Sequence, residues 1–360
     1  MASAMKDLKI LMLARPNLMS YPGGDTTQVL STAKALREKG LIIDVNPDRP
    51  VYDNYDLLHF FNIIDPEDIL GHLERCHKPY VVSTIYCLYE EYDRHYRKDL
   101  IRLAYRFLSR DQVEYLKTVV KWIVKRERLS SYSFLWRGHK GSIRHILHRA
   151  RCLLPNSESE YQRLNADYNI EKQYVVVPNG VNTEEFSDST GNRSIVLCVS
   201  RIEGRKNHIN LIRAMNETDL PLYLVGMPAV NQQAYYKRCK RLASENIHFT
   251  GYVSHEQLLK YYMQARVHVL PSWFETTGLS SLEAATMGCN VVVSDRGDVR
   301  SYFRDDAWYC DPADPDSIRE AILEAYNAPS DNVLPDRIRE EYTWENAARE
   351  TMKGYQIALS

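Results

Sequence analysis

Residues 267–283, VHVLPSWFETTGLSSLE, contain the pattern that decides the fold. The apolar run 267–270 predicts a buried strand, and the segment that Gly278 opens predicts an amphipathic helix. A buried strand, a polar loop and a helix form one unit of a parallel sheet covered on both faces. The same alternation continues on either side. It predicts strands at 194–199, 222–225, 247–249 and 290–294, and helices near 208–215, 232–245, 254–264 and 278–288.

The N-terminal half repeats this pattern. It predicts a helix at 26–39 that Gly40 ends, and strands at 10–14, 41–45, 57–61, 80–85 and 152–155. The two series meet near 178–180, so we expect an α/β protein of two doubly wound, Rossmann-like domains, 1–178 and 179–340, that face each other across a cleft. The closing segment 341–360 is expected to return toward the first domain as a helix. In such sheets, ligands bind outside the carboxyl ends of the strands.

Length and composition agree with this organisation. A chain of 360 residues is long enough for two domains of about 100 to 200 residues each. The seven cysteines are scattered and form no C-x-x-C pair, which favours reduced thiols and a cytoplasmic location. The start of the chain is polar, and no apolar run approaches the roughly 20 residues of a membrane helix. We therefore expect neither a secretory signal nor a membrane-spanning segment.

Charge is segregated along the chain. Residues 94–151 hold sixteen Lys or Arg against four Asp or Glu, a net charge of +12, so the remainder carries −13. The segments 101–108 and 119–126 interleave these cations with apolar residues and are predicted to form basic amphipathic helices. One hypothesis is attraction to anionic lipid at a membrane surface. The alternative is an insertion that packs its apolar face on its own domain, and nucleic acid is disfavoured because no nucleic-acid-binding motif accompanies the charge.

Two loops and one helix carry the polar residues that point to chemistry. After strand 194–199, Arg201 and Lys206 place two cations in one crevice, which suits a diphosphate or is an ordinary surface pair. Glu275 precedes the helix that Gly278 opens, and free N–H groups at such a helix start favour an anion. Glu283 occupies a core-facing position of that helix, where a carboxylate needs a partner. A ribose diol or a neighbouring cation would supply one.

Other candidates are weaker. The Gly23-Gly24 pair precedes the helix at 26–39 and lets backbone approach a ligand, but it is not a G-x-G-x-x-G motif. A helix cap explains Asp314 and Asp316 better than a metal does. A zinc site is disfavoured at the clustered histidines His139, His145 and His148, because no Cys or carboxylate ligands accompany them at zinc-finger spacing.

Taken together, these residues resemble the retaining nucleotide-sugar glycosyltransferases of the GT-B fold, specifically glycosyltransferase family four. Glu275 and Glu283 match the E-x7-E signature of that family, and Ser200-Arg201 through Lys206 match its phosphate-binding Arg and Lys. Gly23-Gly24 is similar to the amino-terminal glycine loop, 177–182 to the interdomain segment, and 344–359 to the closing helices.

The resemblance implies roles for these positions. Arg201 and Lys206 would neutralise the donor diphosphate, Glu283 would hold the ribose and Glu275 would contact the donor sugar. Backbone N–H groups of Gly24, Gly278 and Leu279 would assist in binding the diphosphate, and the loop at Tyr252-Val253 would lie near the base. Gly23 and Thr277 complete the implied donor site. Residues 1–178 would bind the acceptor and 179–340 the nucleotide sugar, with no cofactor and no metal.

Two segments depart from the family pattern. Many relatives have His-Asp after the strand at 80–85, where this chain has Tyr86-Cys87, and His59 is a candidate substitute for the histidine. Relatives often have Gly-Gly-x-x-Glu after strand 290–294, and this chain has Gly297-Asp298-Val299-Arg300. The second departure indicates either an altered preference for the donor sugar or drift at a tolerant site.

The sequence thus predicts a retaining hexosyltransferase. Its donor would be a nucleotide diphosphate sugar, and its acceptor a glycan or lipid-linked glycan in cell-surface polysaccharide or glycoconjugate synthesis. The enzyme would be cytoplasmic, or peripheral at the inner face of the membrane. A sugar-nucleotide epimerase or a non-catalytic binding subunit on the same fold is the alternative.

Overall fold

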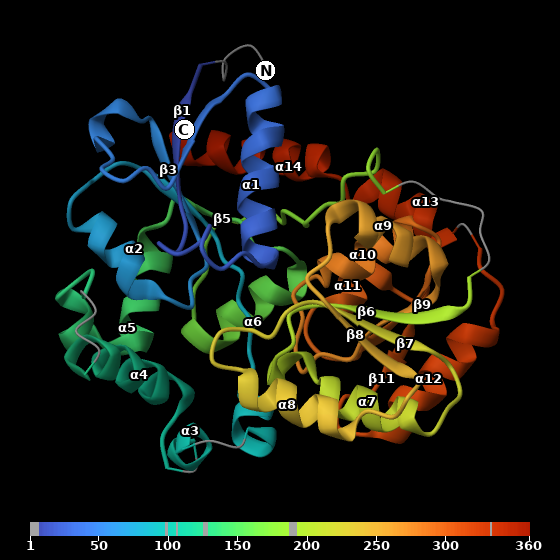
Figure 1. Cartoon of the computed structure of the whole chain (residues 1–360). Helices are drawn as coiled ribbons and strands as arrows, with labels where there is room; N and C mark the ends of the chain where they lie inside the picture. The colour runs from blue at the N-terminus through green and yellow to red at the C-terminus, as the bar shows by residue number, and fades with distance from the viewer. Residues whose placement is uncertain (1–6, 98–99, 106, 125–128, 187–192, 332) are drawn as a thin grey trace. The chain divides into compact units, whose positions relative to one another are not determined.

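The computed structural model describes residues 7–97, 100–105, 107–124, 129–186, 193–331 and 333–360. The chain divides into two compact units (Figure 1). The first comprises residues 1–179 together with 344–360, and the second comprises residues 180–343. The sequence placed these divisions at 178 and 340. All seven cysteines are free.

The first unit is built on a parallel sheet with the strand order β2-β1-β3-β4-β5. Helices α1 and α14 cover one face, where Val29, Leu36 and Tyr355 are buried, and α2, α5 and α6 cover the other. The strands are β1 (Lys9–Leu13), β2 (Ile42–Val45), β3 (Leu57–Phe61), β4 (Tyr80–Ser83) and β5 (Cys152–Leu153). The helices are α1 (Gly24–Glu38), α2 (Pro66–Leu73), α5 (Ser133–Arg149), α6 (Glu158–Tyr168) and α14 (Trp344–Leu359).

The basic insertion lies between β4 and β5. After a π-helical turn at Tyr92–Tyr96 it forms α3 (Leu100–Ala104), α4 (Arg110–Val124) and α5, and α5 is broken at Gly138, whose φ is +67°. The helix predicted at 101–108 ends at Ala104, and residue 106 of that range lies outside the described residues, as do residues 125 and 126 of the helix predicted at 119–126. A new helix begins because Ser109 and Gln112 form a reciprocal cap: Gln112 N–H donates to the Ser109 hydroxyl at 3.3 Å, and Ser109 N–H to the Gln112 side chain at 2.9 Å.

The second unit has a parallel sheet with the order β11-β10-β9-β6-β7-β8. One face buries side chains of α7, α8 and α12, and the other buries side chains of α9, α10, α11 and α13. The strands are β6 (Ile195–Val199), β7 (Leu222–Val225), β8 (Ile247–Gly251), β9 (Ala265–Leu270), β10 (Asn290–Ser294) and β11 (Trp308–Cys310). The helices are α7 (His208–Asn216), α8 (Gln233–Leu242), α9 (His255–Gln264), α10 (Leu279–Thr286), α11 (Val299–Phe303), α12 (Pro315–Asn327) and α13 (Val333–Glu341).

Two local differences from the predicted elements have physical causes. The short strand β11 was not predicted, because three residues at a sheet edge carry too little periodicity to detect. The strand predicted at 80–85 ends at Ser83, because Ile85 has a φ of +45° and leaves the extended region. Within the described residues, none of the helices combines the length and the hydrophobicity that crossing a membrane requires.

Candidate active site

The candidate site lies where the strand order of the second sheet reverses. From β6 the chain continues through β7 to β8 on one side, and from β9 through β10 to β11 on the other. The loops after β6 and β9 therefore diverge, and in doubly wound sheets ligands bind at this position, outside the carboxyl ends of the strands. Lys206 follows β6 and Glu275 follows β9, and the structure brings the two side chains together.

Lys206 and Glu275 form a mostly buried ion pair. The Lys206 Nζ lies 2.5 Å from the Glu275 Oε1. Burial works to lower the pKa of Lys206, but the adjacent Glu275 carboxylate outweighs it, so the pKa is raised and the side chain stays charged. The sequence predicted both residues for the donor site, but it did not predict that they pair with each other.

The backbone of Glu275 is held by the loop after β10. Asp298 N–H donates to the Glu275 carbonyl at 2.8 Å, and Glu275 pairs with Gly297 as an isolated bridge. Gly297 has a φ of +86°, and a Cβ at this position would lie 2.1 Å from the Glu275 carbonyl oxygen. Only glycine fits such a close approach. The segment that departs from the family pattern therefore fixes the position of Glu275.

Two further contacts connect the loops after β6 and β9. Trp273 N–H donates to the Arg205 carbonyl at 2.9 Å, and the Asn207 side chain donates to the carbonyls of Pro271 at 3.1 Å and Pro312 at 2.7 Å. Asn207 precedes α7 in a left-handed conformation, and its side chain makes no capping hydrogen bond. Its amide instead connects the start of α7 to the loops after β9 and β11.

Arg201 is more exposed than Lys206. Its guanidinium lies 3.7 Å from the Glu203 carboxylate, and half of its side chain is accessible to solvent. It is still close enough for its charge to oppose protonation of Lys206. The two predicted cations thus share one edge of the sheet, with Lys206 anchored and Arg201 open to an incoming anion.

Helix α10 begins beside this pair. Gly278 is its N-cap, with a φ of +74° that suits glycine, and Leu279 is the first helical residue. The N-terminus of a helix favours negative charge. The buried Thr277 hydroxyl already donates to the Tyr302 hydroxyl at 3.2 Å, so the contribution of Thr277 to a donor site would come from its backbone.

Glu283 lies one turn further into α10 and is partly buried. Its carboxylate accepts a hydrogen bond from the Tyr262 hydroxyl at 2.8 Å, and burial raises its pKa to about 7. A neighbouring cation was one of the two expected partners. Among the described residues the structure gives Glu283 no ion pair, so that alternative was wrong. Sequence reasoning missed Tyr262, although a tyrosine on the buried face of a helix signals a polar partner for its hydroxyl.

The predicted base loop follows β8 at the same edge of the sheet. Tyr252 is exposed, and Val253 packs partly against the core. Gly251, with a φ of +73°, turns the chain out of the strand. The structure places this loop two strands away from β6, without a hydrogen bond or ion pair to Lys206 or Glu275 among the described contacts.

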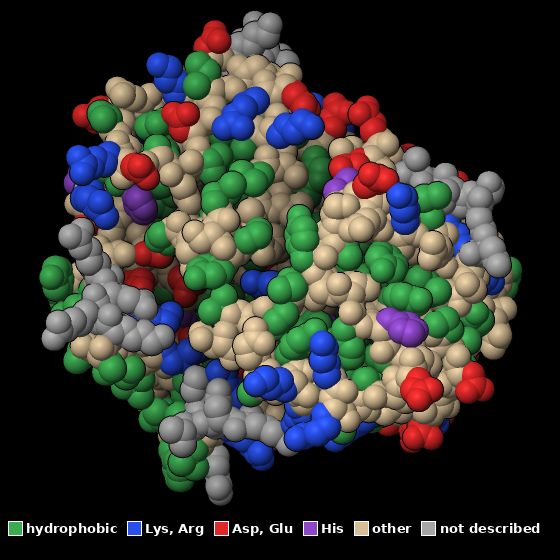
Figure 2. All heavy atoms as spheres, in the orientation of Figure 1, with side chains coloured by type: hydrophobic (Ala, Val, Ile, Leu, Met, Phe, Trp, Pro, Cys, Tyr) green, Lys and Arg blue, Asp and Glu red, His purple; other side chains and the backbone are tan. Residues whose placement is uncertain are grey.

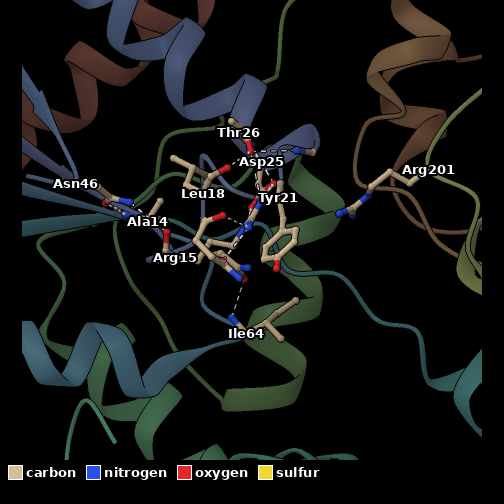
Figure 3. A network of polar contacts seen from close by, with 12 residues as sticks. Ala14, Arg15, Leu18, Tyr21, Asp25, Thr26, Asn46, Ile64 and Arg201 are labelled. Carbon is tan, nitrogen blue, oxygen red and sulfur yellow. Dashed lines mark hydrogen bonds and ion pairs between the residues drawn. The ribbon is translucent and has the colours of Figure 1, made fainter. Parts of the chain in front are cut away.

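Gly23 and Gly24 lie in the first unit, where Gly24 begins α1. Gly23 has ordinary extended backbone, with a φ of −156°, and its N–H donates to the Thr26 hydroxyl at 3.0 Å. Figure 3 shows the neighbouring network, in which the Arg15 guanidinium contacts Asp25 at 2.5 Å and the Tyr21 carbonyl at 2.6 Å. Neither glycine is required by its backbone angles, so conformational freedom does not explain this pair.

His59 does not replace the missing histidine. It is fully buried, its Nδ1 is 2.8 Å from the Tyr355 hydroxyl, and its Nε2 is 2.8 Å from the Ser83 hydroxyl. Burial lowers its pKa to about 3, so the ring is neutral. With both nitrogens bonded inside the core, the candidate role of His59 at a sugar was wrong.

The position that follows β4 has its own network. Tyr86 N–H donates to the buried Glu160 carboxylate at 2.9 Å, and the Tyr86 hydroxyl donates to Asp167. These contacts fix Tyr86 within the first unit and account for its burial.

The other sequence candidates resolve simply. Asp314 caps α12 by accepting from Asp316 N–H at 2.9 Å, which confirms the capping interpretation. His139 is held by hydrogen bonds: its Nδ1 lies 2.8 Å from the Asp111 carboxylate and its Nε2 lies 3.0 Å from the Ile64 carbonyl. In the described part of the chain, no three His, Cys, Asp or Glu side chains form a potential metal site.

This chain is similar in sequence and in structure to known glycosyltransferases. Residues 182–343 match the family Glycosyl transferases group 1. Among solved structures, sucrose-phosphate synthase from Thermosynechococcus elongatus superposes with a TM-score of 0.74 at 16% identity, covering 97% of this chain and 98% of that one. HepE of Anabaena, in complex with UDP and glucose, gives 0.69 at 14% identity, covering 97% and 99%. The chain therefore has the GT-B fold of glycosyltransferases.

Curated relatives agree with this assignment. The chain is 30% identical to an uncharacterized glycosyltransferase of Methanocaldococcus jannaschii over 219 residues, which is 52% of this chain and 55% of the relative. It is also 30% identical to O-antigen chain mannosyltransferase B of Escherichia coli over 172 residues, 45% of each. The matched parts span about half the length of these relatives. The match to the glycosyl transferases group 1 family is confined to residues 182–343, which are less than half of the chain.

Proposed function

We propose that the protein is a retaining glycosyltransferase that moves a sugar from a nucleotide diphosphate donor to a glycan or lipid-linked glycan. The observation that carries the proposal is the Lys206–Glu275 ion pair at the strand reversal of the second sheet. The HepE structure contains UDP and glucose, and the Escherichia coli relative is named for transfer to O-antigen chains. These relatives support a nucleotide diphosphate donor and a glycan acceptor.

Lys206 and Arg201 would stabilise the leaving group. When the bond between the anomeric carbon and the phosphate oxygen breaks, the bonding electrons and the negative charge stay on the diphosphate. A cation fixed in place before reaction stabilises this charge without reorganising. Glu275 supplies that fixation, because its carboxylate already holds the Lys206 ammonium. The N-terminus of α10 adds a favourable dipole beside the same site.

Glu275 would also face the donor sugar, and Glu283 the ribose. A carboxylate has enough acceptor sites to bind two hydroxyl groups, as the ribose diol offers. In front-face transfer, the acceptor oxygen bonds to the anomeric carbon on the side that the phosphate leaves, and its proton passes to that phosphate. Configuration is then retained without a protein nucleophile. We propose that no metal takes part, which transfer measured in excess EDTA tests directly.

The first experiment identifies the donor. A thermal-shift panel of nucleotide diphosphates and nucleotide sugars should reveal one base that stabilises the protein, by about 2.7 kcal/mol when the ligand is present at about 100 times its dissociation constant. Transfer is then measured with a panel of glycan acceptors. Turnover of the donor without an acceptor would favour an epimerase, and donor binding without any turnover would favour a binding subunit.

The second experiment tests the roles. Lys206→Ala and Glu275→Gln should each reduce transfer by about 100-fold or more. The ion pair between Lys260 and Glu256 is an exposed control on α9, so Lys260→Ala and Glu256→Gln should transfer at the wild-type rate. Wild-type rates in the Lys206 and Glu275 variants would refute the assignment.

A further inference from the structure

Helix α4 in the first unit carries a stripe of apolar side chains that is buried at its start and exposed to solvent toward its end. The stripe starts with Val113, which is buried, and continues with residues spaced three, four or one apart, so that they share one side of the helix. These are progressively accessible: Leu116 is 45% exposed, Val120 51%, Ile123 63% and Val124 72%. Figure 2 shows hydrophobic side chains gathered over α4 at the lower left of the molecule. Such a contiguous stripe is unusual on a protein surface facing water.

The helix is attached to its own unit by other residues. The Tyr115 ring stacks on Phe134 with centroids 5.5 Å apart, and its hydroxyl donates to the Leu135 carbonyl at 2.9 Å. The alternative from the sequence was an insertion that packs its apolar face on its own domain and leaves the cations solvated. It describes Val113 and Tyr115, but not the exposed side chains of α4, which are Leu116, Val120, Ile123 and Val124. Helix α4 is therefore attached through the side that carries Tyr115, and the apolar stripe stays accessible to solvent.

Cations accompany the stripe. Lys121 lies beside Val120 on α4 and is exposed, and Lys140 and Arg144 are exposed four residues apart on the adjoining α5. Within the described residues, neither Lys140 nor Arg144 forms an ion pair. The insertion also exposes Leu103 and Phe107. Its amino-acid sequence has a net charge of +12 over residues 94–151.

We infer that α4 docks this enzyme on an anionic lipid bilayer, with the Leu116, Val120, Ile123 and Val124 side chains inserted at the interface and the nearby cations among the lipid phosphates. An amphipathic helix with an apolar face and basic flanks is the form that binds such a surface. A second copy of the chain is disfavoured as the occupant, because two such insertions would bring like charges together. A nucleic acid would pair with the cations but would leave the aliphatic stripe in water.

The test is co-sedimentation of the full chain with vesicles. We expect binding to vesicles containing about one third phosphatidylglycerol, weakening as salt rises, and little binding to pure phosphatidylcholine. Lys140→Gln with Arg144→Gln should weaken the partition by about tenfold or more, since each cation contributes about fivefold. The matched control is Lys237→Gln with Arg241→Gln, an exposed pair with the same spacing on α8.

The apolar stripe has its own variant. Val120→Ser with Ile123→Ser should weaken binding to anionic vesicles by about tenfold or more. The control Val230→Ser with Val333→Ser changes two equally exposed side chains of the second unit and should bind as the wild type does. Far-ultraviolet circular dichroism verifies that all variants are folded.

Three results would overturn the inference. The first is no binding to anionic vesicles at low salt, which would leave a protein partner as the occupant of this face. The second is equal binding to neutral vesicles, which would deny the cations a role. The third is unchanged binding of the Val120 and Ile123 variant, which would mean adsorption by charge without insertion. None of these measurements depends on sugar transfer, so they stand apart from the proposed function.

Discussion

Replacing Glu283 with Gln should remove a pH-dependent loss of stability. In the folded protein, burial raises the pKa of Glu283 from 4.5 to about 7. Between these two values, the folded state keeps a proton that the unfolded state has lost, so stability falls as pH rises. The fall begins above the unfolded value of 4.5 and is complete above about 7. Gln stays neutral and can still accept the hydrogen bond from Tyr262.

The magnitude follows from the two pKa values. Between about pH 5 and pH 8 the wild type should lose about 2.5 kcal/mol that the Gln variant keeps. Urea denaturation of both proteins across this range measures the difference, and every other titrating group cancels in the comparison. If the difference between the two proteins stayed constant to within about 0.5 kcal/mol, the raised pKa of Glu283 in the folded state would be refuted.

The same carboxyl links pH to donor binding. If Glu283 holds the ribose diol, it must be ionised to accept from both hydroxyls. Donor binding at about pH 6 should therefore release close to one proton from the wild type and none from the Glu283→Gln variant. Calorimetry in two buffers of different ionisation enthalpy counts that proton, and equal release from both proteins would place the ribose elsewhere.

Three further predictions concern the candidate site in the second unit and the core of the first unit. Gly297→Ala should destabilise the protein by about 2 kcal/mol or more, because the new methyl group would meet the Glu275 carbonyl and the backbone φ is positive. The control is Gly141→Ala, where the nearest neighbouring side-chain atom is 3.7 Å from the new methyl group, so this variant should be neutral or stabilising. Thermal denaturation compares the two variants. Tyr355→Phe should cost about 1 to 2 kcal/mol, since it leaves His59 Nδ1 buried without its partner, and an unchanged denaturation midpoint would contradict this. Lys206→Met and Glu275→Gln should each cost about 2 kcal/mol or more, while the double variant should recover part of this stability and none of the transfer activity.

The sequence predicted the architecture well because hydrophobic periodicity is a local property. The alternation of strands and helices in the two halves of the chain predicted two doubly wound sheets. The loops at the carboxyl ends of the second sheet contained Lys206 and Glu275, which the structure places at the strand reversal. What could not be predicted were the partners. Lys206 and Glu275 are 69 positions apart, and no pattern in the chain states that they touch.

Glu283 shows where local reasoning stops. The helical pattern correctly marked it as a carboxylate facing the core, which demands a partner. The partner is Tyr262 of α9, and only the packing of α9 beside α10 reveals it. Helix α4 shows the same limit for apolar residues. A stripe with helical spacing looks alike in sequence whether it faces a protein core or lipid, and only the accessibility of Leu116 to Val124 separates the two.

The way Glu275 is held makes its side chain a clean probe of chemistry. Its backbone is fixed by the Asp298 N–H and by the close approach of Gly297, contacts that do not involve the carboxylate. The carboxylate is paired with Lys206. Because the loop is positioned by main chain, Glu275→Gln should leave it in place and remove only the charge. A loss of transfer in that variant therefore reports on the ion pair and the donor, whereas a loss in Gly297→Ala reports on the position of the loop.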